Sequence, residues 1–531
     1  MEVIELPDFG LISDEIRRHA KVAPQRPALI CGTHQLSYGE FDRSIDRVAA
    51  SLQRDGLRPG DSIAICAIAS VVYAVVFLGA LRAGVVVAPL APGSTAAGLA
   101  RMVADADAKL VFVDGATAGE FAAFAAGKPH GAARYLNLDD HVGRDGNTRF
   151  SDWLAPAGAV PTDVPLVPSA PFNIIYSSGT TGEPKGIVQP HAMRWSHVRR
   201  GRSYGYGPQS ITLLATPLYS NTTLVVFFPT LAFGGTVVLM PKFDAIGYLQ
   251  LAERLRVTHT MLVPVQYQRL MAHVDFERYD LRGFQMKFST SAPFGAALKA
   301  DVLRRWPGGL IEFYGMTEGG GTCILEAHRH PDKLHTVGLP AQGHDIRLID
   351  DEGRGVAAGA SGEVVGHSSG MMNGYHGQPE KTREAEWFAP DGKRFIRTGD
   401  VGRFDEDGFL ILFDRKKDMI ISGGFNIYPS DLEAQLRLHP SVAEAAVVGV
   451  PSQQWGETPV AFVVLKPGAA EPVHELKDWF NSQVGKTQRL AALVQLAELP
   501  RSAIGKVLKR DLRAAYAADR SASSAKPAGH A

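Results

Sequence analysis

The chain has 531 residues, which is too long for a single hydrophobic core, so we expect a large multilayer body with at least one further domain. Lysine and arginine together number 55, as do aspartate and glutamate, and this balance argues against a surface that attracts nucleic acid or anionic lipid. Apolar residues at 45% and charged residues at 21% are typical of a globular protein and exclude disorder as the default.

The cysteines and the first residues indicate a reducing compartment. Cys31, Cys66 and Cys323 are scattered and odd in number, which does not suit a disulfide framework. Residues 1–5 lack the basic stretch and apolar core of a signal peptide. We therefore expect a cytoplasmic protein without an integral membrane segment; its oligomeric state is left open, with a homodimer among the possibilities.

Strand-like segments alternate with helix-like stretches as far as Asp350, which predicts an α/β fold with mostly parallel sheets. The strand-like segments are residues 28–31, 109–113, 172–176, 211–216, 236–240 and 260–264.

One uncharged run, residues 63–81, is long enough to span a bilayer. Its alternative is a buried strand over residues 63–69, a packed helix after Ser70 and a second strand near residues 85–89. Frequent alanine, together with Gly84 and Pro89, favours that alternative, because strands of a parallel sheet covered on both faces are continuously apolar.

Beyond Gly338 the pattern changes to short strands and glycine-rich turns. Asp407-Gly408, between residues 401–404 and 409–413, predicts a hairpin because both central positions favour positive φ. A smaller unit follows, with predicted helices at residues 430–438 and 475–483 and strands at residues 443–450 and 460–465. The predicted organisation is an N-terminal domain over residues 1–414, a small α+β C-terminal domain over residues 415–517 and a disordered tail over residues 518–531.

A segment rich in glycine and hydroxyl groups directly follows the predicted strand 172–176 and predicts a phosphate-binding loop. Glycines let backbone N–H groups close on an anion, hydroxyls add donors, and Lys185 adds charge. A flexible linker is the alternative, but linkers seldom follow a core strand directly. A P-loop NTPase or kinase is disfavoured, since Gly186 follows Lys185 where a Walker A motif needs Ser or Thr. The loop residues assigned to phosphate are Ser177, Ser178, Gly179, Thr180, Thr181 and Lys185.

Four further motifs follow along the chain. Tyr314-Gly315-Met316-Thr317-Glu318 offers an aromatic face, a small hydroxyl and a hard oxygen ligand, which suit a magnesium nucleotide. Asp400 ends Arg397-Thr398-Gly399-Asp400, and its two carboxylate oxygens can accept from both ribose hydroxyls. The last two motifs are residues 414–429, with paired glycines at 423 and 424, and residues 500–506, which end in Gly505-Lys506. Taken singly, each has a structural alternative, namely a core tyrosine, a turn aspartate or a solvated lysine.

These five motifs, in this order between Leu36 and Arg510, resemble the AMP-forming acyl-CoA synthetases and their adenylate-forming relatives, which include coumarate-CoA ligases, fatty acyl-CoA ligases and firefly luciferases. The resemblance implies an acid–thiol ligase that uses ATP, Mg²⁺ and coenzyme A and proceeds through an acyl-adenylate. It also implies a small barrel-like part in the large domain and a mobile C-terminal domain that turns about Lys417 between the two half-reactions.

The resemblance also assigns roles to individual residues. Lys506 is the expected catalytic group together with Thr181 and Glu318, because it would bridge the attacking carboxylate and the phosphate. Glu318 would also hold Mg²⁺, and Lys242, Gly423 and Gly424 would contact coenzyme A. The remaining nucleotide-binding residues are Glu312, Phe313, Tyr314, Gly315, Thr317, Asp400, Arg415 and Lys417.

The acid-binding pocket is expected, from motif position, to be lined by uncharged residues. None of them could pair with a second carboxylate, and burying an unpaired charge would be costly. Ser220 stands where many relatives carry histidine, and the glycines at 319–321 are expected to leave space. An aromatic or medium-chain hydrophobic monocarboxylic acid is therefore predicted. The expected pocket residues are Tyr219, Ser220, Asn221, Thr222, Val226, Thr290, Ser291, Ala292, Gly319, Gly320 and Gly321.

Two other functions share part of this evidence. A stand-alone adenylation enzyme that loads an acid onto a carrier protein has every motif, but Lys242 and the lack of a carrier-protein domain after Lys506 favour free coenzyme A. A non-catalytic nucleotide-binding or membrane-associated protein is disfavoured by the intact site carboxylates and Lys506. A zinc site is also disfavoured, because its candidate ligands match no zinc spacing. Those candidates are Cys323, Glu326, His328 and His330.

Overall fold

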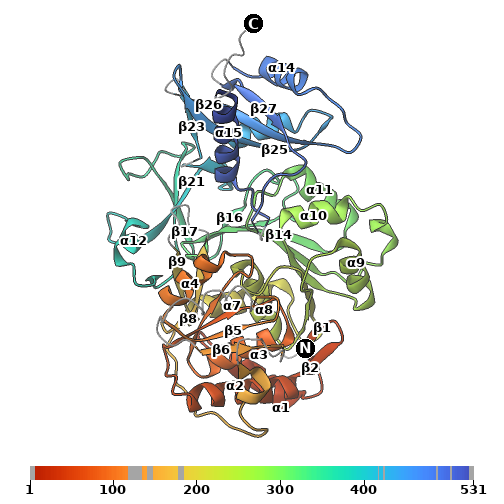
Figure 1. Ribbon diagram of the computed structural model, residues 1–531, viewed down its shortest axis with the longest axis vertical. Coiled ribbons are helices and arrows are strands. Elements are labelled where there is room, and N and C mark those ends of the chain that lie inside the picture. Colours follow the sequence, from red (N-terminus) through yellow and green to blue (C-terminus); the bar gives the residue numbers. More distant parts are fainter. Residues whose placement is uncertain are drawn as a thin grey trace. The chain divides into compact units, whose positions relative to one another are not determined.

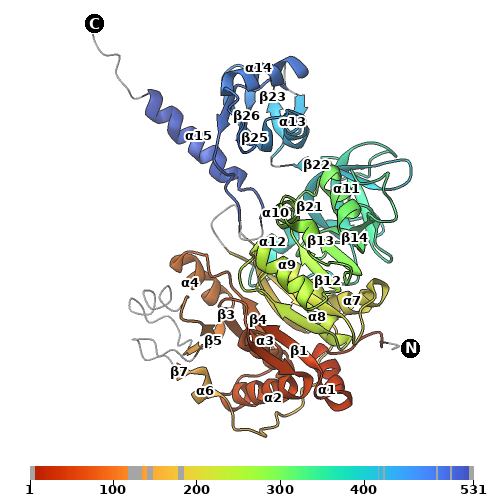
Figure 2. The same ribbon diagram turned by 90° about the vertical axis from the view of Figure 1, so that its right-hand side faces the viewer.

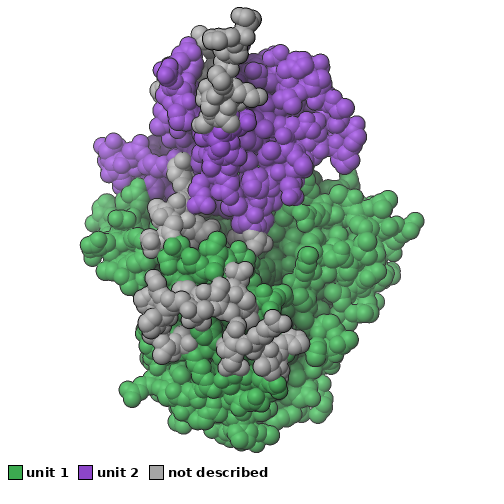
Figure 3. All heavy atoms as spheres, viewed as in Figure 1, with its two compact units in different colours: residues 1–346, 365–397 green, residues 347–364, 398–531 purple. Residues whose placement is uncertain are grey.

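A computed structural model describes residues 6–117, 134–139, 148–177, 184–416, 418–422, 425–485, 488–502 and 505–524. The chain forms two compact units, which Figure 3 shows in different colours. Unit 1 comprises residues 1–346 and 365–397, and unit 2 comprises residues 347–364 and 398–531. The sequence predicts that the mobile C-terminal domain begins at residue 415. This boundary differs from the division into compact units, and it stays a prediction.

The first sheet of unit 1 has the strand order β19-β9-β8-β4-β3-β5-β6-β7. Pairs from β8 to β7 are parallel, whereas β9 is antiparallel to β8 and to β19. Its strands are β3 (Ser62–Cys66), β4 (Val86–Pro89), β5 (Ala108–Val113), β6 (Arg134–Asn137), β7 (Thr148–Arg149), β8 (Pro171–Ser177), β9 (Lys185–Pro190) and β19 (Gly374–Tyr375).

The second sheet of unit 1 has the order β16-β15-β14-β13-β12-β10-β11-β1-β2. The pairs from β14 to β1 are parallel, and β2, β15 and β16 pair in antiparallel fashion at the two edges. Its strands are β1 (Pro27–Cys31), β2 (His34–Ser37), β10 (Ile211–Leu214), β11 (Thr236–Leu239), β12 (His259–Leu262), β13 (Met286–Ser289), β14 (Gly309–Gly315), β15 (Thr322–Glu326) and β16 (Leu339–Pro340). All six strand segments predicted in this part of the chain overlap observed strands, which confirms the α/β alternation.

Helices pack on both sheets of unit 1 (Figures 1 and 2). They include α1 (Ile12–Val22), α2 (Tyr38–Arg54), α3 (Val71–Arg82), α4 (Ala96–Asp105), α6 (Phe150–Trp153), α7 (His191–Gly201), α8 (Asn221–Ala232), α9 (Ala245–Arg254), α10 (Pro264–Met271), α11 (Ala296–Arg305) and α12 (Pro379–Glu384), with short 3₁₀ turns at Arg202–Tyr204 and Phe276–Arg278.

Helix α3 explains the long uncharged run in the sequence. Every residue of α3 except Val72 is buried. The ring of Phe77 lies 6.2 Å from that of Phe172 on β8 and 5.7 Å from that of Phe228 on α8. A helix enclosed on all sides by protein needs no polar face. No helix in the described ranges is long and apolar enough to cross a membrane, so the strand-then-helix alternative is confirmed.

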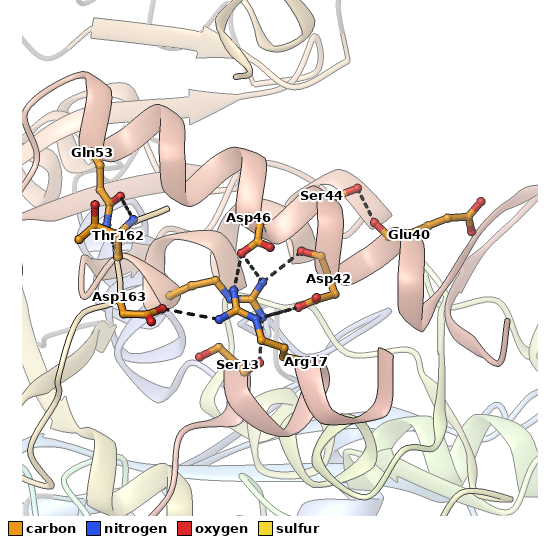
Figure 4. A network of polar contacts seen from close by, with 10 residues as sticks. Ser13, Arg17, Glu40, Asp42, Ser44, Asp46, Gln53, Thr162 and Asp163 are labelled. Carbon is orange, nitrogen blue, oxygen red and sulfur yellow. Dashed lines mark hydrogen bonds and ion pairs between the residues drawn. The ribbon is translucent and has the colours of Figure 1, made fainter. Parts of the chain in front are cut away.

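A polar network joins α1, α2 and α3 (Figure 4). Asp46 Oδ1 on α2 accepts hydrogen bonds from Arg17 Nη2 on α1 at 2.6 Å and from Arg82 Nη1 on α3 at 2.9 Å. Arg82 Nη2 also lies 2.6 Å from Asp42 Oδ1, and the Arg82 side chain is only 5% exposed. Since a buried guanidinium is costly without carboxylate partners, these pairs fix how the three helices pack.

A third, smaller sheet has the order β17-β18-β21-β20, with β22 paired to β21, and corresponds to the expected barrel-like part. Asp405 N donates to Phe409 O at 2.9 Å, and Gly408 has a φ of 82°, so the predicted hairpin between β21 and β22 is confirmed. The strands are β17 (Asp345–Ile349), β18 (Gly362–His367), β20 (Glu386–Phe388), β21 (Arg394–Phe404) and β22 (Leu410–Arg415).

The remaining sheet lies within unit 2 and belongs to an α+β fold, as predicted. Its sheet has the order β24-β23-β26-β25, and β27 runs parallel to β26. Val447 packs with residues of α13 and α14 on one face, whereas Val448 packs with Leu512 of α15 on the other. The elements are β23 (Ile420–Ser422), β24 (Phe425–Ile427), α13 (Pro429–Leu436), β25 (Val442–Ser452), β26 (Gly456–Leu465), α14 (Val473–Gln483), β27 (Ala492–Gln495) and α15 (Lys509–Ser524).

The predicted disordered tail begins too early. Helix α15 continues to Ser524, so residues 518–524 are helical, while residues 525–531 lie outside the described part of the chain. The segment is rich in alanine and arginine, both strong helix formers, and its first turns are anchored by the buried Leu512.

Candidate functional site

The predicted phosphate-binding segment lies between two antiparallel strands of unit 1. Ser177, the last residue of β8, is paired in register with Lys185, the first residue of β9. The described residues stop at Ser177 and resume at Pro184. Ser178, Gly179, Thr180, Thr181, Lys417, Gly423 and Gly424 lie outside the described residues, as do the side chains of Ser177 and Arg415.

Lys185, Tyr375 and Glu318 form a chain of contacts at the start of β9. Lys185 Nζ lies over the Tyr375 ring, 5.4 Å from its centroid, which is a cation–π geometry. The Tyr375 hydroxyl donates to Glu318 Oε1 at 2.9 Å. Burial, and then the charge of Glu318, raise the pKa of Tyr375, so its phenol remains a donor. The predicted phosphate lysine and the predicted metal ligand are thus brought together by a tyrosine that the sequence analysis did not identify.

The turn that carries Thr317 and Glu318 is held on several sides. Gln189 Nε2 on β9 donates to Thr317 O at 2.6 Å, and Met372 N donates to Glu318 O at 2.8 Å. Gly319 N closes the turn onto Met316 O at 3.0 Å, and Ser368 Oγ donates to Gly319 O at 2.7 Å. The backbone next to the predicted metal ligand is therefore fixed by bonds to other segments of unit 1.

Strand β14 carries four of the residues expected around the nucleotide, and the surroundings of their side chains differ from one residue to the next. Tyr314 is half-buried, and Phe313 stacks on Phe288 with ring centroids 5.6 Å apart. Glu312 is buried in an ion pair with the equally buried Lys299 of α11. Burial raises the pKa of Glu312, and the charge of Lys299 opposes that rise. The Glu312 carboxylate is thus bound by protein, which leaves its predicted contact with the nucleotide as a proposal.

The predicted acid pocket is drawn from the start of α8 and the segment after β13. Ser220 caps α8 by accepting from Thr222 N at 3.3 Å. The hydroxyls of Thr222 and Ser291 lie 2.5 Å apart, and Ser291 has a φ of 79°, a strained value for a residue with a side chain. Asn221 Oδ1 accepts from Gln189 Nε2 at 3.3 Å. Val226 is buried, and Tyr219, Thr290 and Ala292 are half-buried. The acid-pocket and nucleotide segments therefore meet at Gln189.

The expectation that the glycines at 319–321 leave space is wrong. A Cβ on Gly319 would lie 2.5 Å from Gly370 O and from Met193 Cε. A Cβ on Gly320 or Gly321 would lie 2.6 Å or less from an isoleucine side chain. Gly319 and Gly321 also have φ values of 73° and 102°. These glycines are required by close packing and backbone conformation, so they do not open the pocket.

Three further predicted residues lie at described positions, Lys242 and Lys506 on loops and Asp400 within β21. Lys242 is exposed between β11 and α9 of unit 1. In unit 2, Asp400 N donates to Thr398 Oγ1 at 3.0 Å, after Gly399 with a φ of 70°. Lys506 N donates to Ser502 Oγ at 3.2 Å, in a turn closed by Ser502 N to Lys506 O at 2.8 Å. Their roles toward nucleotide and coenzyme A stay proposals.

The sequence did carry a signal for the residues that were missed. Asn173 on β8 and Gln189 on β9 are polar residues that lie between apolar neighbours in their strands, and both side chains are fully buried. Such residues need hydrogen-bond partners, and here they find each other at 2.9 Å between Asn173 Nδ2 and Gln189 Oε1. Tyr375 gave no comparable signal, because its strand consists of two residues.

The candidate zinc ligands do not gather around a common point. Cys323 is buried on β15, Glu326 pairs with Arg329, and His328 Nδ1 lies 3.1 Å from Leu310 O. Within the described ranges, no group of three His, Cys, Asp or Glu side chains is placed to hold a metal ion.

Comparisons with known proteins match nearly the whole chain. The family described as AMP-binding enzyme matches residues 16–376, and the AMP-binding enzyme C-terminal domain matches residues 431–506. Feruloyl-CoA synthase of Amycolatopsis sp is 33% identical over 509 residues, covering 95% of this chain and 98% of that protein. Indoleacetate–CoA ligase of Aromatoleum aromaticum is 31% identical over 513 residues, covering 94% and 97%. Among solved structures, ATP-bound MatB from Rhodopseudomonas palustris superposes with a TM-score of 0.85 at 29% identity, covering 95% of this chain and 99% of that one.

Proposed function

Because this chain belongs to the AMP-binding enzyme family and is an AMP-forming acid–thiol ligase that uses ATP, we propose that it joins an aromatic monocarboxylic acid to free coenzyme A. The observation that supports the choice of acid is that Asn221, Thr222 and Ser291, which we assign to the acid pocket, are uncharged and joined to their neighbours by hydrogen bonds. Amide and hydroxyl groups can hydrogen-bond the polar substituents of an aromatic acid, whereas a second carboxylate would be buried without a cation there. Feruloyl and indoleacetyl groups, the acyl groups in the names of two relatives, have this chemistry.

The two steps follow from what a carboxylate lacks. It is a poor electrophile, so its oxygen must first become part of a better leaving group. In the first step the carboxylate oxygen bonds to the α-phosphorus of ATP and pyrophosphate leaves. In the second step the thiol sulfur of coenzyme A bonds to the acyl carbon, AMP leaves with the electron pair of the broken C–O bond, and the thiol proton is released.

The described residues support the first step by position and charge. Lys185 brings a cation to the end of the phosphate-binding segment, where pyrophosphate would carry negative charge. Gln189 fixes the backbone at Thr317, whose hydroxyl we assign to the α-phosphate. Tyr314 would stack on adenine and Asp400 would bind ribose. Lys506 would bridge the carboxylate and the phosphate, and Lys242 would meet the coenzyme A nucleotide; the loop and hinge residues outside the described ranges keep the roles that the resemblance implies.

Glu318 fits the magnesium ion that ATP brings. Magnesium is usually held by one or two carboxylates together with phosphate oxygens and waters. Tyr375 fixes Oε1 of Glu318, and the described structure gives Oε2 no hydrogen-bond partner, so one carboxylate oxygen is oriented and the other is available. When bound, the ion neutralises charge on the phosphate oxygens.

A screen of acids tests the proposal. The protein would be incubated with ATP, MgCl₂ and a panel that includes ferulate, indoleacetate, octanoate, glutarate and free amino acids, with and without coenzyme A. Pyrophosphate release would be followed continuously, and acyl-CoA would be identified by mass spectrometry. We expect the fastest turnover, and an acyl-CoA product, with an aromatic monocarboxylate. Preference for glutarate or for an amino acid would refute the acid class. Adenylate formation without acyl-CoA would instead favour a carrier-protein acceptor.

A further inference from the structure

Arg194 on α7 is a fully buried cation in unit 1 whose described partners are neutral. Its side chain is 0% exposed. Nε donates to Asn173 Oδ1 at 3.1 Å, Nη2 donates to Gln189 Oε1, and the guanidinium lies 5.9 Å from the centroid of the Phe172 ring. Within the described residues no carboxylate lies within ion-pair distance of Arg194. Burying such a charge is costly, so packing alone does not explain why an arginine occupies this position.

The consequence of this arrangement is a single orientation for the Gln189 amide. Its oxygen accepts from both Arg194 Nη2 and Asn173 Nδ2, so its NH₂ group must point the other way. There it donates to Thr317 O at 2.6 Å and to Asn221 Oδ1 at 3.3 Å. With the amide reversed, an oxygen would face the Thr317 carbonyl and an NH₂ group would face the guanidinium. The buried charge on Arg194 therefore excludes the reversed form.

We propose that Arg194 and Gln189 are positioning residues for adenylate formation: Arg194 orients the Gln189 amide, and Gln189 sets the Thr317–Glu318 turn and the start of α8 relative to each other. The two segments that it joins are those assigned above to ATP and to the acid, so the inference rests on the proposed function. Neither side chain touches the reacting atoms. Their effect is on the distance between the bound acid and the α-phosphate, to which a two-substrate reaction is sensitive.

Gln189→Glu separates positioning from packing. The carboxylate keeps the acceptor for Arg194 and Asn173 and gains an ion pair with Arg194, so the fold should keep or raise its melting temperature. It replaces the NH₂ donor with an oxygen that repels the Thr317 carbonyl. We expect the rate of pyrophosphate release to fall by about 10²-fold, the usual order for a displaced substrate. We also expect weaker binding of ATP·Mg in calorimetry, which requires no acid. Wild-type values for both in the folded variant would overturn the proposal.

A matched control uses the same substitution on the same kind of bond elsewhere in unit 1. Gln53 Nε2 on α2 donates to Thr162 O at 2.8 Å at an exposed position (Figure 4). Gln53→Glu should leave pyrophosphate release and ATP binding unchanged, and an equal loss there would overturn the assignment by showing an unspecific effect. If Gln189→Glu fails to fold, the triple variant Asn173→Val, Gln189→Leu and Arg194→Leu removes the buried charge together with both amides that it bonds, so that no unpaired guanidinium is left behind. A folded triple variant with the wild-type rate would overturn the proposal. If the wild-type protein turned over no acid, the proposed function would fail, while ATP calorimetry on the same variants would still test the positioning of the turn.

Discussion

Tyr375→Phe removes one hydrogen bond and leaves the ring under Lys185 in place. The bond is an O–H donor to a carboxylate at 2.9 Å, and the tyrosine is 9% exposed. A hydrogen bond to a charged group contributes about 1.5–3 kcal/mol. Glu318 is half-buried, so water can replace part of this, and we expect a loss near the lower end of the range. Because ~1.4 kcal/mol corresponds to a factor of ten, kcat/KM for ATP should fall by about tenfold.

The assay is the initial rate of pyrophosphate release at varied ATP and varied Mg²⁺. A less restrained Glu318 should raise the Mg²⁺ concentration needed for half-maximal rate. Phenylalanine keeps the ring face that attracts Lys185, so the effect reports on the hydroxyl alone. The control is Tyr248→Phe, which removes a buried hydroxyl bonded to Thr260 Oγ1 at 2.8 Å in the same unit. It should lower the melting temperature without changing the Mg²⁺ dependence. Wild-type kinetics in Tyr375→Phe would refute the reasoning.

Further substitutions test other parts of the molecule. Lys506→Ala should slow acyl-adenylate formation by about 10²-fold or more and spare thioester formation from prepared acyl-adenylate and coenzyme A, measured as separate half-reactions; equal loss in both would contradict the assignment. Asp400→Ala should weaken ATP use by about 2 kcal/mol, seen in KM and kcat for ATP, because hydrogen bonds to ribose are lost. Arg82→Met should lower the free energy of unfolding by about 3 kcal/mol, because two carboxylates lose a buried partner; an unchanged melting curve would count against the network. Burial lowers the pKa of His259 to about 4, so the unfolded chain binds the proton more strongly between pH 6.5 and 4 and stability should fall as the pH falls through that window. His259→Gln should reduce this pH dependence in melting curves, and an unaltered pH dependence would exclude His259 as a source.

The fold was predictable because its signals are local. Strands in a covered parallel sheet are continuously apolar, and the segment that became β3, α3 and β4 shows this over a run that could also have spanned a membrane. Frequent alanine within the run, together with Gly84 and Pro89, favoured the buried strand and helix before any tertiary contact was known. The hairpin after β21 follows in the same way from Asp407-Gly408. The sequence predicted disorder from residue 518 onward because the alanine-rich end of α15 has few large apolar residues, although its residues favour a helix.

The supports of the site were not predictable, because each depends on which segment lies opposite. Glu318 and Tyr375 are 57 positions apart, and Gln189 and Thr317 are 128 apart. Motif order gave the residues expected to touch substrates but not those that hold them. The glycines at 319–321 show the same dependence on segments distant in the sequence. The missing Cβ of a glycine leaves room for a ligand only where no other segment of the chain fills that room. At Gly366, a Cβ would lie 1.5 Å from Gly320 O. The backbone of residues 366–370 already occupies the space that the sequence left open. We therefore propose that the hydroxyl and amide groups of α8 and of the segment after β13 shape the acid pocket, and we expect substitutions there to change which acid is accepted.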